Sequence, residues 1–186
     1  MKYILFMFMI PSLTLMAFAA PDFDKAEKDI KFLKPNEVKE LPLSVKNVLE
    51  SENCEIPVMP GAQKPTSWAK GSFAEIGQTD WAVLCSNSSS KSQVRIIWGG
   101  KSKPCPESFG FADNKTYLQV QDENTIMFSR MIGSVGPKRV VSLLKKSKGP
   151  LPSSFSQDAI VDSFVGKGST AHFCTAGNWQ EVIASD

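Results

Sequence analysis

The alternation of apolar and polar residues predicts a protein built mainly of β-strands. Apolar positions alternate along Gln93–Trp98, whereas Asp80–Ser86 is apolar on both faces, as in a central strand that is covered on each side. With Trp68–Ile76, these segments predict a three-stranded meander. Two further hairpins are expected, with strands at Thr116–Val120, Thr125–Arg130, Ser169–Thr175 and Trp179–Ala184.

Helical periodicity is confined to short segments. Leu43–Ser51 places its valines and its second leucine on one face at helical spacing. Pro137–Lys146 matches a helix that begins with proline and ends in two lysines, and Asp24–Lys34 has room for one or two turns. The sequence therefore predicts an α+β, β-dominated fold, an antiparallel sheet with two or three short helices. We expect a loop at Lys101–Phe109, which contains two prolines.

The first 19 residues have the pattern of a secretory signal peptide. A single charge precedes an almost wholly apolar stretch, and small residues at Ala17 and Ala19 form a cleavage site. An uncleaved membrane anchor is the alternative, but Pro11 and the small residues favour cleavage. We therefore expect a periplasmic or secreted protein with no stable membrane span after cleavage.

Two segments follow the predicted signal peptide. Residues 20–41 are rich in lysine, aspartate and glutamate and are interrupted by proline, which is typical of a flexible charged arm. Residues 42–186 are long enough for one domain with a hydrophobic core. We therefore predict a flexible N-terminal arm and a single α+β domain.

Four cysteines lie beyond the signal peptide, at Cys54, Cys85, Cys105 and Cys174. An even number in an oxidising compartment predicts disulfide bonds. Their spacing does not choose among the three possible pairings, of which we favour Cys54–Cys85 and Cys105–Cys174. Zinc ligands usually occur as close pairs, whereas the gaps here are 31, 20 and 69 residues. We predict no metal site and, without a glycine-rich phosphate loop, no nucleotide cofactor.

The charge balance argues against nucleic acid as a partner. The chain has 21 basic and 19 acidic residues, and phosphate binding needs a surplus of lysine and arginine on one face. A local basic run, Lys138–Lys148, could meet an acidic partner or an anionic envelope surface. The alternative interpretation is the solvated face of a helix.

His172 and Asp80 are the first candidates for chemistry. His172 is the only histidine and could act as a general base, or it could be a strand residue with one hydrogen bond. Asp80 precedes the most apolar strand, and its alternative role is to cap the preceding turn. Hydrolysis by two carboxylates would draw on further acids, and the candidates are Asp158, Asp162 and Glu75. No Gly-x-Ser-x-Gly sequence marks a serine nucleophile, so we assign no catalytic residue.

Two tryptophans are candidate anchors for a partner. Trp68 and Trp179 lie beside polar turns, and exposed tryptophan can bind protein or sugar. Ordinary packing in the core is the alternative. With Asp80 and His172, they make up the predicted binding residues.

Several short motifs carry a resemblance to known proteins. The run Gly71–Cys85, with the pattern G-x-F-x-x-x-G-Q-x-D-W-A-V-L-C, resembles a stretch in secreted bacterial proteins of unassigned function. Cys54–Pro57, Phe164–Ser169 and Gly177–Trp179 are similar to further motifs of those proteins. The glycine pattern also resembles one turn of an integrin-type FG-GAP repeat, although neither a repeat nor a calcium loop accompanies it. The resemblance implies a secreted single-domain protein and brings no catalytic residues.

The sequence thus favours a secreted or periplasmic, non-enzymatic binding protein. Its expected partner is another macromolecule, a protein of the cell envelope or outside the cell, as for inhibitors and immunity-type proteins. A cell-wall or polysaccharide hydrolase that uses acidic residues is the alternative. A structural part of a larger envelope assembly is a third hypothesis.

Overall fold

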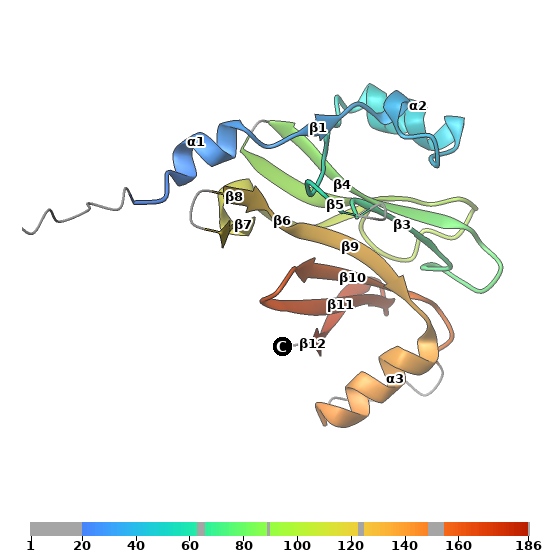
Figure 1. Cartoon of the computed structure of the whole chain (residues 1–186). Helices are drawn as coiled ribbons and strands as arrows, with labels where there is room; N and C mark the ends of the chain where they lie inside the picture. Colours follow the sequence, from blue (N-terminus) through green and yellow to red (C-terminus); the bar gives the residue numbers. More distant parts are fainter. Residues whose placement is uncertain (1–19, 63–65, 89, 123–124, 149–154, 186) are drawn as a thin grey trace, which may run out of the picture.

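The computed structural model of the chain describes residues 20–62, 66–88, 90–122, 125–148 and 155–185. Within this part, two four-stranded antiparallel sheets pack face to face, and a helix covers the outer face of each (Figure 1). The resulting four layers give an α+β fold dominated by β-strands, as the sequence predicts. The predicted signal peptide, residues 1–19, lies outside the described residues.

The first sheet is built around a strand that is buried on both faces. Ala82 and Leu84 of the second strand in this sheet pack toward the other sheet, whereas Val83 and Cys85 pack toward α2 (Leu43–Ser51). This arrangement confirms the prediction of a strand covered on each side. The strands, in spatial order, are β3 (Trp68–Gly71), β4 (Asp80–Ser88), β5 (Lys91–Ile97) and β6 (Ser108–Asp113).

The second sheet lies between the first sheet and α3 (Pro137–Lys146). Ile132 and Ile160 on its inner face join the core between the sheets. Leu143 and Leu144 of α3 pack on its outer face, because the apolar positions of this helix fall on one side. The strands, in spatial order, are β12 (Asn178–Ser185), β11 (Gly168–Thr175), β10 (Ala159–Phe164) and β9 (Arg130–Val135).

The two sheets approach each other differently along their two sides. Along β3 and β9 they are joined, and the backbone N–H of Ile132 donates to the carbonyl oxygen of Thr66 at 2.7 Å. The opposite edges are β6 and β12, and near one end Cys105–Cys174 links the loop before β6 to β11, the strand beside β12. The sandwich is therefore closed along one side and open along the other.

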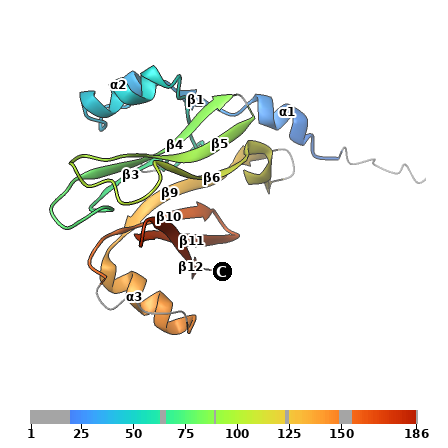
Figure 2. The ribbon, with the colours of Figure 1, turned by 180° about the vertical axis from the view of Figure 1, so that it is seen from behind.

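The N-terminal segment differs from the flexible arm predicted for residues 20–41. The helix α1 (Phe23–Lys28) lies beside a hairpin of β7 (Leu118–Asp122) and β8 (Thr125–Phe128) (Figure 2). Ile30, which follows α1, is buried in the cluster that also contains Leu118 and Phe128. Burial of these apolar side chains holds the segment against the body.

The rest of this segment leads under α2. A short strand, β1 (Phe32–Leu33), pairs with β2 (Ile56–Pro57), and the 3₁₀ turn η1 (Pro35–Glu37) follows β1. Val38 and Leu41 are buried in the same cluster as the apolar face of α2. The packing therefore does not divide at residue 42, where the sequence predicts the domain to begin.

Both expected disulfide bonds are present. Cys54–Cys85 fixes the chain after α2 to β4, and Cys105–Cys174 joins the loop before β6 to β11. Two disulfides are consistent with an oxidising environment. Among the described residues, none of the helices is long and apolar enough to cross a membrane.

Several strand boundaries differ from the predicted ones. β3 ends at Gly71 rather than Ile76, because Phe73 and Ala74 leave the sheet and are buried beside it. The predicted strand Thr125–Arg130 is divided at Ser129, whose N–H donates to the carbonyl oxygen of Tyr117. β6 overlaps the predicted loop and, like β10, was not predicted as a strand.

Candidate functional site

The open side of the sandwich forms a cleft of about 530 Å³ between the two sheets, which we call the open-edge cleft. Strands β6, β10, β11 and β12 contribute to its wall, together with the 3₁₀ turn η2 (Asn114–Tyr117) and the β10–β11 turn. The lining residues are Gly110, Tyr117, Asp162, Phe164, Lys167, Gly168, Ser169, Thr170, His172, Ile183 and Ser185.

A buried arginine lies directly behind the wall of this cleft. Arg130 is 0% exposed, and each of its five guanidinium N–H groups has an acceptor. Nε and Nη2 donate to the two carboxylate oxygens of Asp162 at 3.1 and 2.7 Å. Nη1 donates to the carbonyl oxygen and Oγ of Ser92, and Nη2 also donates to the carbonyl oxygen of Gly110 at 2.6 Å. The network joins both sheets and fixes their separation at the cleft.

Tyr117 covers the other side of this guanidinium. The centroid of its ring lies 4.6 Å from Cζ of Arg130, and the ring meets that of Phe164 edge-on at 5.5 Å. Burial raises the pKa of the Tyr117 hydroxyl; Asp162 adds to this effect and Arg130 opposes it. The phenol is therefore neutral at pH 7, and this wall offers an aromatic surface rather than a charge.

His172 lies at the β12 side of the cleft. Its ring contacts that of Phe109 at a centroid distance of 4.4 Å, and its Nδ1 is 4.0 Å from the Glu181 carboxylate. Burial lowers the pKa of His172, and Arg130 acts in the same direction against the opposing effects of Asp162 and Glu181. The imidazole is therefore neutral at pH 7.

The edge strand β12 borders the cleft. The turn from β11 consists of Ala176 and Gly177, which both have positive φ, 50° and 83°, as in a type I′ turn. In such a hairpin the flanking pair is hydrogen-bonded, so the backbone N–H and C=O groups of Trp179, Glu181 and Ile183 point away from β11. Ile183 is 65% exposed. The edge thus presents backbone groups and an apolar side chain together.

Asp80 lies away from the cleft and is completely buried. One carboxylate oxygen accepts the backbone N–H of Ala74 at 2.9 Å. The other accepts the N–H of Gly99 at 3.0 Å and the Gln78 amide at 2.7 Å. The Gln78 bond lies within the turn of the capping alternative, whereas Ala74 and Gly99 lie outside it, and the three donors together enclose the carboxylate.

The two candidate tryptophans are half-buried. Trp68 packs against the cluster beneath α2. Trp179 stacks on Trp98 at a centroid distance of 6.1 Å and contacts Phe109 at 4.9 Å, while its indole N–H donates to the carbonyl oxygen of Pro106 at 2.8 Å. Trp179 therefore closes one end of the open side, near His172, whereas Trp68 and Asp80 are not brought to the cleft.

The remaining acidic candidates are separated. Asp158 accepts the backbone N–H of Ser72 at 2.9 Å, where it joins the two sheets on their closed side. Glu75 is exposed in the loop after β3. Of the acids named from the sequence, Asp162 alone lines the cleft. Among the described residues, no group of three or more His, Cys, Asp or Glu side chains is arranged to hold a metal ion.

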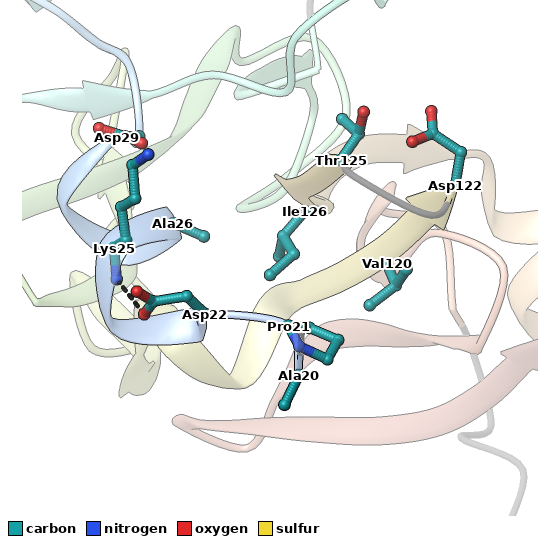
Figure 3. A pocket seen from close by; sticks show the side chains of 10 residues that line it. All are labelled: Ala20, Pro21, Asp22, Lys25, Ala26, Asp29, Val120, Asp122, Thr125 and Ile126. Atoms are coloured by element: carbon teal, nitrogen blue, oxygen red, sulfur yellow. Dashed lines mark hydrogen bonds between the residues drawn. The ribbon is translucent and has the colours of Figure 1, made fainter. Parts of the chain in front are cut away.

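A second hollow, of about 330 Å³, lies between α1 and the β7–β8 hairpin (Figure 3). Val120 and Ile126 project from the hairpin, and Lys25 and Ala26 lie on the α1 side. The backbone N–H of Lys25 donates to the side chain of Asp22, which caps α1. This hollow is smaller than the open-edge cleft and follows from the docking of α1.

Sequence reasoning did not identify Arg130, Tyr117 or Gly110. A signal for the first was available, because Arg130 and Asp162 are opposite charges within two otherwise uncharged strands. Gly110 has a φ of +66°, and a Cβ there would lie 2.8 Å from Nη2 of Arg130. Its role depends on a contact between strands far apart in sequence, which local patterns do not reveal.

No protein-family model matches this chain, and no curated protein or solved structure matches it.

Proposed function

We propose that this protein binds another macromolecule, and that its binding site is the open-edge cleft with the adjoining edge of β12. The observation that carries the proposal is this edge itself. Its outward backbone groups lie beside a cleft of about 530 Å³, and Ile183 is exposed between them. An unpaired edge with an exposed apolar residue is a template for another chain.

The proposed occupant is an extended segment of a partner protein. Such a segment can pair its backbone with the edge of a sheet, while alternate side chains enter neighbouring pockets. In the cleft, Phe164 and Tyr117 offer an aromatic wall, and Thr170 and Ser169 offer hydroxyl groups. Lys167 is the cation of the lining and would favour an acidic residue in the segment.

The side chains that could support hydrolysis do not form a hydrogen-bonded acid–base pair. Both carboxylate oxygens of Asp162 accept hydrogen bonds from Arg130. Asp162 and Glu181 both act electrostatically on His172. The closest oxygen of Glu181 is 4.0 Å from Nδ1 of His172, beyond hydrogen-bond distance. These contacts support binding over the hydrolase alternative.

We also propose that the protein acts in the periplasm or outside the cell. The two disulfide bonds support an oxidising compartment. The charged start, apolar run and small residues of positions 1–19 support export. An inhibitor in that compartment would act by occupying a segment that its partner needs for its own activity.

Photo-crosslinking from inside the cleft tests the proposal. A photoreactive residue replaces Ile183, which is 65% exposed, and in a matched protein it replaces Ile76, which is 73% exposed on the loop after β3. We expect one protein of the envelope or extracellular fraction to crosslink in stoichiometric yield from position 183 and not from position 76. The crosslinked partner residues should form one continuous segment.

Two substitutions in β12 then test the mode of binding. Glu181→Pro removes an N–H that points away from β11, so the hairpin should persist while the partner is lost. Ile183→Asp should weaken binding at least tenfold, whereas Ile76→Asp should not. Equal crosslinking from both positions would contradict the proposal, as would turnover of cell-wall polysaccharide that His172→Ala abolishes.

A further inference from the structure

The outer face of α3 carries a concentration of positive charge that the open-edge cleft does not use. Leu143 and Leu144 face the second sheet, so the polar positions of the helix form the outermost surface on this side of the molecule (Figure 1). Neither the helix nor the two residues that follow it include an acid. The exposed cations of this segment are Lys138, Arg139, Lys145, Lys146 and Lys148.

These five side chains are not neutralised within the described part of the chain. None of them is in an ion pair there, although other lysines of the surface, such as Lys91 and Lys103, are paired with carboxylates. The whole sequence has 21 basic and 19 acidic residues. Without these five cations it would have 16 basic against 19 acidic residues. The charge of the molecule is therefore asymmetric, with α3 as its positive end.

We propose that α3 is a docking face for an anionic lipid surface. The helix is convex and lies outermost, so a flat surface can contact its cations together. Clusters of four to eight lysine and arginine residues bind anionic headgroups in this way. The apolar side of α3 is buried against the protein's own sheet, so the attachment is electrostatic, without insertion of the helix into the bilayer.

The chemistry of this face favours lipid over other anionic partners. Its exposed helical positions are four cations and Ser142. A single-stranded nucleic acid would need aromatic side chains on which to stack its bases, and this face has none. A protein partner would need a buried apolar or aromatic anchor at the centre of the contact, which these positions also lack. Diffuse charge on a convex surface suits a plane of headgroups.

Vesicle co-sedimentation with the full chain tests the proposal. The probes are vesicles of phosphatidylcholine alone and vesicles in which one third of the lipid is phosphatidylglycerol. We expect binding to the anionic vesicles at about 0.1 M salt, loss of binding at about 1 M salt because the charges are screened, and none to neutral vesicles. Each cation removed from the face should weaken binding about fivefold.

Two variants with the same change of net charge locate the effect. The first carries Lys138→Gln, Arg139→Gln, Lys145→Gln and Lys146→Gln, which preserve helix propensity. The second carries glutamine at four exposed lysines elsewhere, namely Lys31→Gln, Lys39→Gln, Lys70→Gln and Lys101→Gln. Circular dichroism confirms that both are folded before vesicles are added.

The first variant should lose binding to anionic vesicles, and the second should keep it within about fivefold. Equal loss in both would overturn the proposal in favour of net charge alone. The proposal also fails if the wild-type chain does not bind anionic vesicles, binds neutral vesicles equally, or prefers single-stranded DNA or heparin at the same concentration of negative charge.

Discussion

Arg130 and Asp162 place opposite charges inside the sandwich, at the point where the two sheets begin to separate. Arg130 uses all five of its donors there, on acceptors from three other strands. A buried ion pair contributes little net stability over apolar residues of similar volume, but removing one partner leaves a charge without compensation. The pair therefore fixes the shape of the open-edge cleft. Substituting one partner alone should destabilise the folded protein, because the other charge would stay buried without compensation.

Asp162→Asn tests this role. The substitution keeps the shape of the side chain and leaves the Arg130 charge buried, so we expect a loss of about 3–5 kcal/mol in the free energy of unfolding. Urea denaturation measures it. Asp113→Asn, at the exposed pair with Lys91, should cost less than about 1 kcal/mol. Replacing both buried partners, with Arg130→Met and Asp162→Leu, should recover much of the loss. Equal stability of the Asp162 and Asp113 variants would contradict the role.

His172 makes stability depend on pH. Burial lowers its pKa below the ordinary 6.5, so the unfolded chain takes up the proton before the folded chain does. Above pH 6.5, His172 therefore does not lower the free energy of unfolding. As the pH drops from 6.5 through the lowered pKa of the folded state, the free energy of unfolding falls.

His172→Gln should remove the part of the pH dependence of stability that comes from His172. The stability difference between about pH 7.5 and about pH 5.5, measured by urea denaturation, should be smaller in the variant than in the wild-type protein. An unchanged difference would show that other groups cause the pH dependence.

At the scale of elements, the local sequence pattern was sufficient to predict helices α2 and α3 but not to predict all of the strands. Helices α2 and α3 span the predicted ranges because apolar spacing and flanking prolines determine them. β6 and β10 lack such signals. β6 contains a glycine with positive φ, and β10 carries Asp162, so each depends on contacts with distant strands.

Two leucines of α2 provide a matched test of the outer layer. Leu49 lies on the buried face of α2 and is 0% exposed, whereas Leu43, the first residue of α2, is 73% exposed. Leu49→Ala should lower the free energy of unfolding by about 2–5 kcal/mol, because it leaves a cavity. Leu43→Ala should change it by less than about 0.5 kcal/mol. Similar losses in both variants would mean that α2 does not pack on the first sheet as described.

At the scale of the whole molecule, the fold class and the disulfide bonds were predicted from the sequence, whereas the way in which the layers pack together was not. The β-dominated α+β class and both disulfides are confirmed, and the pairing was favoured among three rather than deduced. The separation of the strands into two sheets was not predicted, nor was the packing of residues 20–41. Both arise from contacts between distant segments, such as Ile132 with Thr66.

The cleft was beyond sequence reasoning for the same reason. His172 and Trp179 were chosen as binding candidates from local features, and both lie at the open side. Asp80 and Trp68 were chosen in the same way and lie elsewhere. The local sequence can identify a candidate side chain, but the order of the strands in the sheets determines which side chains lie close together.

Cys105–Cys174 holds this open side at one end. Replacing both cysteines by alanine should lower the free energy of unfolding by about 2–4 kcal/mol. It should also increase hydrogen exchange in β6 and β12, while the joined edges β3 and β9 stay protected. Uniform exchange across all four strands would contradict this position for the cross-link.

Residue-resolved hydrogen exchange of β12, with and without the crosslink-identified partner, tests the central claim most directly. The amides of Glu181 and Ile183 point away from β11 and should exchange rapidly in the unbound protein. Pairing with a partner segment should slow both at least tenfold, while the inward amides of Gln180 and Val182, already protected, change little. Protection that instead appears on α2 or the β7–β8 hairpin, with Glu181 and Ile183 unchanged, would contradict the open-edge cleft as the binding site.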